Sequence, residues 1–191
     1  ALRHRLQQGL ARNAGSASFE PDPDIVKLFY AVDGARQNDA PYVLQFVAAT
    51  PGEGTSTIAA AFAATASLEY RLPVLLLDCG PGPGPSIASA LAETGSVEPA
   101  IEAVAGADRL FRARLANAPN PLLQIDGPDL RDILSLLKER YAAIVLDCAA
   151  ASAANDSLRV SHHCDGTVLV VRAEHARRRT VAWARDTIER F

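Results

Sequence analysis

Short, almost continuous apolar runs alternate along the chain with stretches whose apolar residues recur at helical spacing. The runs predict buried strands at 42–49, 73–78, 142–147 and 166–171. The helical spacing predicts helices at 24–37, 56–70, 129–140 and 180–191, with smaller helices at 85–93, 97–105 and 107–116 and a weak strand at 122–125. Buried strands that alternate with helices are typical of a parallel sheet covered on both faces. We therefore predict an α/β, three-layer, doubly wound fold with a mostly parallel sheet.

The beginning of the chain differs from the rest in composition. Residues 1–23 are polar and interrupted by glycine and proline, which is typical of a flexible segment. The helical pattern starts at Asp24, an aspartate that can cap a first turn. With 191 residues, the chain has room for one ordinary domain. We therefore predict a flexible N-terminal segment at 1–23 and one folded domain at 24–191.

A glycine-bearing segment separates the first predicted strand from the helix that follows it. Its sequence over 49–57 is Ala-Thr-Pro-Gly-Glu-Gly-Thr-Ser-Thr. A glycine loop in this place turns backbone N–H groups inward, and the next helix directs its positive end to the same point. That geometry is the phosphate cradle of a P-loop, written G-x-x-x-x-G-K-[ST]. The pattern predicts nucleotide binding by Gly52, Glu53, Gly54, Thr55, Ser56 and Thr57.

The segment departs from the P-loop pattern at two positions. Ala49 stands where the first glycine belongs, and Thr55 stands where the lysine belongs. The lysine ammonium contacts the β- and γ-phosphates, and removing one such donor from a transition state commonly costs on the order of 100- to 1000-fold in rate. Threonine supplies neither the charge nor the reach, whereas Ser56 keeps a hydroxyl for magnesium. Two interpretations stay open: a site that binds ATP or ADP with Mg²⁺ but transfers phosphate poorly, and a glycine turn without any cofactor.

Aspartates stand at the ends of two of the predicted strands. Asp78 follows the apolar run that begins at Val74, and Asp147 follows Ile144 to Leu146. The carboxyl ends of parallel strands form the edge where α/β sheets bind ligands, and an aspartate there commonly holds the magnesium shell. We therefore predict Asp78 and Asp147 as catalytic candidates, with Ser56 and Asp147 as ligands of a bound Mg²⁺. A purely structural hydrogen-bonding role is the alternative for both aspartates.

Charge and cysteine content narrow the classes of function. The 19 basic and 22 acidic side chains give a net charge of −3, which disfavours a nucleic-acid binder. Lys27 and Lys138 are the only lysines, and neither lies in the glycine loop. The three cysteines form no C-x-x-C pair, and no apolar run approaches the roughly 18 residues of a membrane-spanning helix. These features predict a reducing, cytoplasmic location.

The order of these motifs resembles the cytoplasmic kinase domain of bacterial tyrosine kinases (BY-kinases), relatives of the MinD/ParA group of P-loop ATPases. The loop at 49–57 matches the family's Pro-Gly-Glu-Gly-Lys-Ser-Thr except at the lysine, and 74–78 resembles the start of its second acidic motif. Residues 141–147 resemble the Walker B strand, and 165–173 resemble the Asp-Gly-Val block near the family's end. The resemblance covers about 24–191 and implies a P-loop NTPase fold.

The chain also departs from the family where the family performs chemistry. The second aspartate of the acidic motif, which the resemblance implies as an aid to deprotonation of the acceptor tyrosine, falls at Gly80. The Glu-x-x-Arg-x-x-Arg oligomerisation helix is present only as Asp24, Lys27 and Tyr30. The resemblance therefore implies a degenerate member with weak or no phosphotransfer, a pseudokinase that regulates or scaffolds exopolysaccharide or capsule synthesis and export.

The resemblance further implies the partners and the location of the chain. The expected partners are membrane proteins of polysaccharide synthesis and export, with a homo-oligomer as a further expectation and no nucleic acid. The expected location is cytoplasmic, at the inner membrane, held there by a partner or by a segment outside this sequence. An active MinD/ParA-type ATPase that positions or regulates a membrane machine is the alternative, and it requires another basic residue in place of the lysine.

Overall fold

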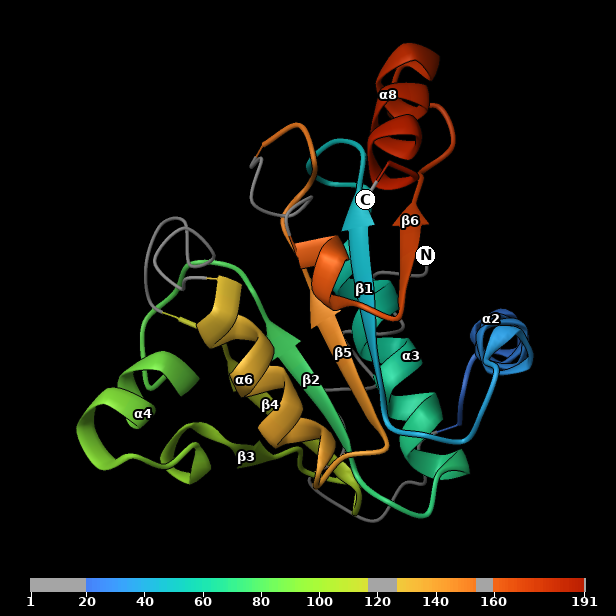
Figure 1. The fold of residues 1–191 in the computed structure, drawn as a ribbon. Helices are drawn as coiled ribbons and strands as arrows, with labels where there is room; N and C mark the ends of the chain where they lie inside the picture. Colours follow the sequence, from blue (N-terminus) through green and yellow to red (C-terminus); the bar gives the residue numbers. More distant parts are fainter. Residues whose placement is uncertain (1–19, 117–126, 154–159, 191) are drawn as a thin grey trace.

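A six-stranded sheet forms the middle layer in the computed structural model, which describes residues 20–116, 127–153 and 160–190 (Figure 1). In chain order the elements are α2 (Pro23–Ala35), β1 (Tyr42–Ala48), α3 (Thr55–Glu69), β2 (Val74–Asp78), α4 (Ile87–Thr94), the 3₁₀ turn η1 (Glu98–Ala100), β3 (Glu102–Ala103), β4 (Leu110–Arg114), α6 (Gly127–Lys138), β5 (Ala143–Asp147), the 3₁₀ turn η2 (Ser161–His163), β6 (Gly166–Val170) and α8 (Arg178–Ile188). The strand order is β3-β4-β2-β5-β1-β6, and only β3 runs antiparallel to its neighbour. The predicted α/β fold with a mostly parallel sheet is confirmed.

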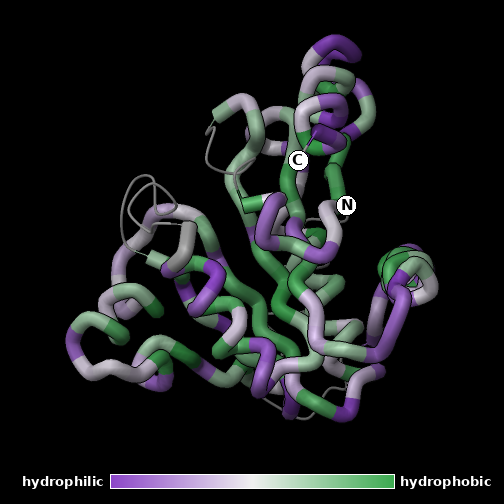
Figure 2. Tube along the Cα trace, in the orientation of Figure 1, coloured by the Kyte–Doolittle hydropathy of each residue, from purple (hydrophilic) through white to green (hydrophobic). Residues whose placement is uncertain are grey.

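Helices cover both faces of the sheet because the central strands are apolar on both sides. Every residue of β1 is buried. On one face Leu75 and Leu77 pack with Ile87 of α4 and Leu134 of α6. On the other face α2 and α3 bury aromatic side chains, including Phe62, against β1 and β5. Figure 2 shows this as hydrophobic strands inside a more polar outer layer. Burial on two faces explains why these strands read as continuous apolar runs.

The parallel register aligns the strand ends that matter for function. Asp78 at the end of β2 is the register partner of Asp147 at the end of β5. Phe46 of β1 pairs with the same Asp147, so the loop that follows β1 begins beside it. The sheet therefore brings the glycine loop and both aspartates to one edge, as expected for the carboxyl ends of parallel strands.

The predicted helices at 97–105 and 107–116 are wrong. The structure has η1 and the short β3 in the first stretch and β4 in the second. Leu110 and Ala113 are buried three residues apart, which imitates helical spacing, but β4 pairs with the edge of β2 from Leu110 to Arg114. Gly106, with φ of 81°, adopts the left-handed conformation before β4. Tertiary pairing here outweighs the local pattern.

The remaining predictions divide into those that agree and those that lie outside the described residues. The other predicted strands and helices match observed ones within a few residues. The weak strand at 122–125 and most of the predicted flexible segment at 1–23 lie outside the described residues. The domain boundary therefore stays a prediction. Among the described helices, none combines the length and the apolar character that a bilayer crossing requires.

Candidate nucleotide and magnesium site

The loop between β1 and α3 has the backbone shape of a phosphate cradle. Gly52 (φ 86°) and Gly54 (φ 95°) both adopt the left-handed conformation, which glycine enters without the strain of a side chain. Gly54 is the N-cap of α3 and offers no side chain to the first turn. The first N–H groups of a helix lack partners within the helix, and α3 has no acidic residue in its first turn. This end of the 15-residue helix therefore favours an anion.

Glu53 holds the loop from the inside. Its side chain is buried, and its carboxylate accepts hydrogen bonds from the backbone N–H of Thr50 (2.8 Å) and of Arg172 (3.3 Å). The Glu53 side chain thus acts as a brace that ties the loop to the segment after β6, and only its backbone N–H is left for the predicted nucleotide contact. Thr50 also carries a buried hydroxyl that has no hydrogen-bond partner among the described residues. A buried polar atom without a partner is costly, and a bound polar ligand would satisfy it.

A second brace comes from a residue that sequence reasoning missed. The Nε2 of His175 lies 2.9 Å from the carbonyl oxygen of Pro51, so this nitrogen carries the donated proton. A Cβ placed on Gly52 would lie 3.5 Å from the same Nε2, so His175 covers the first turn of the loop. Because β6 lies beside β1, the two segments meet although they are 124 residues apart in sequence. No local pattern around His175 indicates this contact.

Ser56 and Asp147 lie together where a magnesium ligand pair is expected. The Ser56 hydroxyl donates a hydrogen bond to the Asp147 carboxylate. The pKa of Asp147 is raised to about 6, mainly by burial; the Ser56 hydrogen bond opposes the rise and the nearby Asp78 charge adds to it. Within the described residues no cation pairs with Asp147. A hydroxyl and a carboxylate without a counter-ion are oxygen ligands that suit Mg²⁺.

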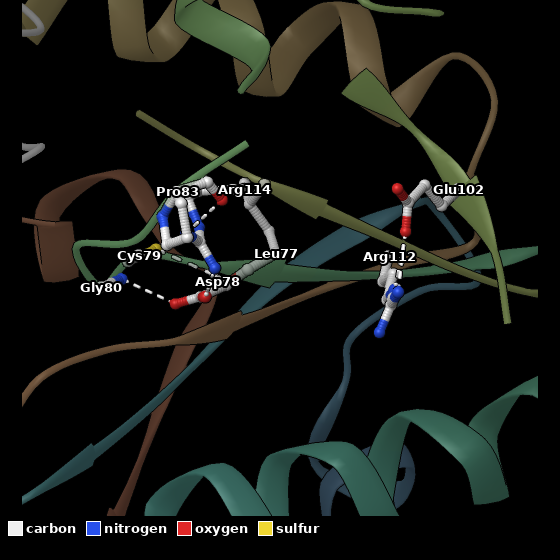
Figure 3. A network of polar contacts seen from close by, with 8 residues as sticks. All are labelled: Leu77, Asp78, Cys79, Gly80, Pro83, Glu102, Arg112 and Arg114. Atoms are coloured by element: carbon white, nitrogen blue, oxygen red, sulfur yellow. Dashed lines mark hydrogen bonds and ion pairs between the residues drawn. The ribbon is translucent and has the colours of Figure 1, made fainter. Parts of the chain in front are cut away.

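Asp78 is held very differently, by an arginine from the next strand. Its carboxylate accepts hydrogen bonds from the Arg114 guanidinium (2.9 Å) and from the Gly80 N–H (2.8 Å). Arg114 also donates to the carbonyl oxygen of Pro83 (3.1 Å), so the ion pair fastens the 80–85 loop to the sheet edge (Figure 3). Asp78 is therefore neutralised by a neighbour. Figure 3 also shows Arg112 and Glu102, which pair between β4 and β3.

The cysteines beside the two aspartates are buried together. Cys79 and Cys148 are each almost fully buried, and the Cys148 side chain is a hydrogen-bond partner of Cys79. This hydrogen bond and burial raise the pKa of the Cys79 thiol well above its ordinary value. A thiol that stays protonated is a poor nucleophile, so Cys79 behaves as a small apolar residue.

No lysine compensates for threonine in the loop. Thr55 is partly buried at the first position of α3. Lys27 pairs with Asp24 on the exposed face of α2 (2.9 Å). Lys138, the last residue of α6, pairs with Asp165 just before β6 (2.8 Å). The predicted site residues are thus brought to one place, with oxygen ligands and backbone donors present and the usual ammonium replaced by a hydroxyl.

The fold is shared with solved kinase and ATPase domains. The VpsO kinase domain aligns with a TM-score of 0.76 and 21% identity over 98% of this chain and 91% of that one. The kinase domain of the Escherichia coli tyrosine kinase ETK aligns at 0.72 and 18%, over 86% and 67%. The Mycobacterium smegmatis cobyrinic acid a,c-diamide synthase, solved with an ATP analogue and magnesium, aligns at 0.63 and 19%, over 79% and 68%. No protein-family model and no curated protein matches the sequence. The predicted resemblance to bacterial tyrosine kinase domains is confirmed for the fold.

Proposed function

We propose that this chain is a BY-kinase-like P-loop domain that binds a magnesium nucleotide but transfers phosphate weakly or not at all. The observation that carries the proposal is a division within one site. The glycine loop and the Ser56–Asp147 pair are present, whereas Thr55 stands at the lysine position and Asp78 is held in an ion pair with Arg114. Binding groups without the transfer groups are what a regulatory pseudokinase needs.

The residues at the site fit a magnesium nucleotide. The backbone N–H groups of 52–57 would surround the phosphates, and Ser56 and Asp147 would hold the metal. Bound Mg²⁺·ATP would supply the phosphoryl group and part of the charge that offsets its negative oxygens. Thr55 donates one neutral hydrogen bond at most, where a charge-assisted bond contributes roughly 1.5–3 kcal/mol. The proposed loss in transfer rate follows from this difference.

The setting of this activity rests on the family resemblance. We place the domain in exopolysaccharide or capsule synthesis and export, as a regulator or scaffold for the membrane proteins of that pathway. The proposed location is the cytoplasmic side of the inner membrane. A homo-oligomer belongs to the same proposal, but α2 gives it no support, because Asp24, Lys27 and Tyr30 stand where the family's helix has a glutamate and two arginines.

One observation favours the alternative of an active ATPase. Arg114 places a guanidinium beside Asp78, at the same edge of the sheet as the loop. If Arg114 left Asp78 for a bound phosphate, it would restore a cation to the site. The alternative predicts ATP hydrolysis that Arg114→Met abolishes.

Calorimetric titration with Mg²⁺·ADP and Mg²⁺·ATP tests the proposal. We expect the wild-type chain to bind both nucleotides and to release no phosphate above background. Thr55→Lys adds the missing ammonium and should tighten Mg²⁺·ATP binding by about tenfold or more. Thr55→Gln is the matched control, because it adds length without charge and should leave the affinity nearly unchanged.

Each other outcome contradicts a stated part of the proposal. Steady ATP hydrolysis by the wild-type chain, lost in Arg114→Met, favours the ATPase. If neither nucleotide gives a heat of binding or a thermal shift, the chain is a pure interaction module whose loop binds no nucleotide. Equal tightening by Thr55→Lys and Thr55→Gln shows that the charge at position 55 is not what the site lacks.

A further inference from the structure

A polar cavity lies far from the glycine loop. It has a volume of about 230 Å³ and lies between α6 on one side and η2 with the residues after it on the other. Asp165, at its rim, accepts a hydrogen bond from the N–H of Val43 near the start of β1. The glycine loop follows the other end of β1, about 20 Å away at the usual rise of a strand. The two sites are therefore distinct.

Four of the eight residues that line the cavity have basic side chains. Arg131 and Lys138 come from α6, and His162 and His163 come from η2. Asp165 is the only carboxylate among the lining residues, and its oxygen accepts bonds from Lys138 (2.8 Å) and from the Val43 N–H (2.7 Å). Among the described residues no carboxylate pairs with Arg131. The single negative charge is thus already neutralised.

The histidine side of the cavity is fixed in place. The Ser161 hydroxyl, in the same turn as the two histidines, donates to the side-chain oxygen of the fully buried Gln45 (2.7 Å). The Cys164 thiol donates to the carbonyl oxygen of Val160 (3.2 Å), which closes the turn from the other end. These bonds hold His162 and His163 opposite α6, so little ordering is needed for a ligand to meet them.

The local electrostatics favour an anion near Arg131. Burial lowers the pKa of His163, and the positive charges of Arg131 and His162 lower it further. Lys138 and Asp165 also line the cavity but are paired with each other. The C-terminal end of α6, where Lys138 lies, carries the negative end of the helix dipole and disfavours an anion there. A negative ligand would therefore lie toward Arg131 and the histidines.

We propose that this cavity binds a small phosphomonoester through Arg131, His162 and His163. A guanidinium recognises two phosphate oxygens at once, and imidazole N–H groups donate to the third. The volume is below that of sites for drug-sized ligands, so the ester carries a small polar substituent. The proposal does not depend on nucleotide binding at the glycine loop.

Titration of the purified chain with glycerol 3-phosphate, inorganic phosphate and sulfate tests the proposal. Proton NMR of the histidine rings follows each addition. We expect saturable binding with shifts at His162 and His163, strongest for glycerol 3-phosphate. Arg131→Gln should weaken it by about tenfold, since it removes a charge-assisted contact. Arg179→Gln, an exposed arginine at the start of α8, is the matched control and should change it little.

The pH dependence adds a readout that a structural role would not produce. Sulfate keeps its charge from about pH 5.5 to about pH 8, so its affinity reports the protein groups alone. We expect the affinity for sulfate to fall as pH rises, because the His163 ring loses its proton and with it one positive charge at the cavity. His163→Gln should flatten this dependence.

Three results would overturn the proposal. The first is an equal loss of affinity in Arg131→Gln and Arg179→Gln, which would indicate unspecific charge attraction. The second is loss of binding in Ser56→Ala but not in Arg131→Gln, which would place the anion at the glycine loop. The third is the absence of any saturable shift at the histidine rings.

Discussion

Asp78 and Asp147 are register partners at the ends of neighbouring strands, yet they have opposite surroundings. Asp78 is paired with Arg114 and with the Gly80 N–H, and its side chain is 42% exposed. Asp147 is partly buried and has a hydroxyl for a partner, and its pKa is raised to about 6, mainly by burial. The same residue type at equivalent positions thus clamps a loop in one case and stays open to a cation in the other. The side chains that surround each aspartate decide between these roles.

The difference between the aspartates follows from the strand order. Arg114 reaches Asp78 because β4 pairs with β2 on the side away from β5. Asp147 lies between β2 and β1, where the described neighbours supply no guanidinium and Ser56 enters from α3. A bound metal would occupy the open carboxylate. We therefore expect changes at the two positions to have opposite effects on stability.

The largest expected effect is a gain in stability from Asp147→Asn. Burial raises the pKa of Asp147 from 3.8 to about 6, so folding favours the protonated form. The stability that this preference contributes is complete below about pH 4 and is lost as pH rises through about 6. At pH 8 Asp147→Asn should therefore raise the free energy of unfolding by on the order of 2 kcal/mol, measured by urea denaturation.

The matched variant is Asp78→Asn on the neighbouring strand. It removes one partner of a partly exposed ion pair and should lower the free energy of unfolding by at most about 1 kcal/mol. At pH 4 the gain from Asp147→Asn should disappear, because Asp147 is then protonated in the folded chain. A gain of equal size at pH 4 and pH 8 would mean that packing, and not charge, causes it.

The next effect concerns the clamp on Asp78, by which we mean its ion pair with Arg114. Arg114→Met should lower the free energy of unfolding by about 1 kcal/mol, since it removes the bonds to Asp78 and Pro83 while its stem still packs. The loss is limited because the buried Nε of Arg114 has no partner among the described residues. Urea denaturation at low and high salt measures it, and high salt should reduce the difference.

Arg112→Met is the control on the same strand. Arg112 pairs with Glu102, but its side chain is 65% exposed against 23% for Arg114. We expect a loss of less than about 0.5 kcal/mol. An equal or larger loss in Arg112→Met would contradict the idea that the clamp at Asp78 is the stronger of the two pairs.

Much of the fold and the cradle could be predicted because their signals are local. A strand buried on two faces is recognisable within a few residues, and so is the glycine loop between 49 and 57. Asp78 and Asp147 are the last residues of their strands, so predicting the strands also predicted that both aspartates lie at the same edge of the sheet. Ser56 was predicted as a magnesium ligand from its place in the P-loop pattern, and that role stays a prediction; its hydroxyl donates a hydrogen bond to Asp147.

The rest could not be predicted because it depends on which strands are neighbours. Arg114 meets Asp78 across 36 residues, and His175 meets Pro51 across 124. Arg114 itself lay in a predicted helix, where it had no reason to face Asp78. Once β4 is known to pair with β2, its last residue lies beside the end of β2. A strand with few buried residues carries a weak sequence signal, and β4, which lies between β3 and β2, is such a strand and positions Arg114 beside Asp78.

A further small effect is expected from Gly82→Ala in the loop that Arg114 holds. A Cβ on Gly82 would lie 1.7 Å from a terminal nitrogen of Arg114, the far end of a flexible side chain. The guanidinium should therefore move off Asp78 while the backbone stays, at a cost of about 0.5 kcal/mol in urea denaturation.

Gly34→Ala in α2 is the control for Gly82→Ala, because a Cβ there meets nothing within 4 Å. The alanine reduces the conformational freedom of the unfolded chain and should therefore stabilise the protein. The double variant Gly82→Ala with Arg114→Met then decides whether Gly82 acts through Arg114. If it does, the alanine adds almost no further loss once the arginine is gone, since the clash and the ion pair disappear together. If the two losses in the free energy of unfolding are additive, Gly82 is required for the conformation of the loop itself. The ion pair between Arg114 and Asp78 then does not depend on having glycine at position 82.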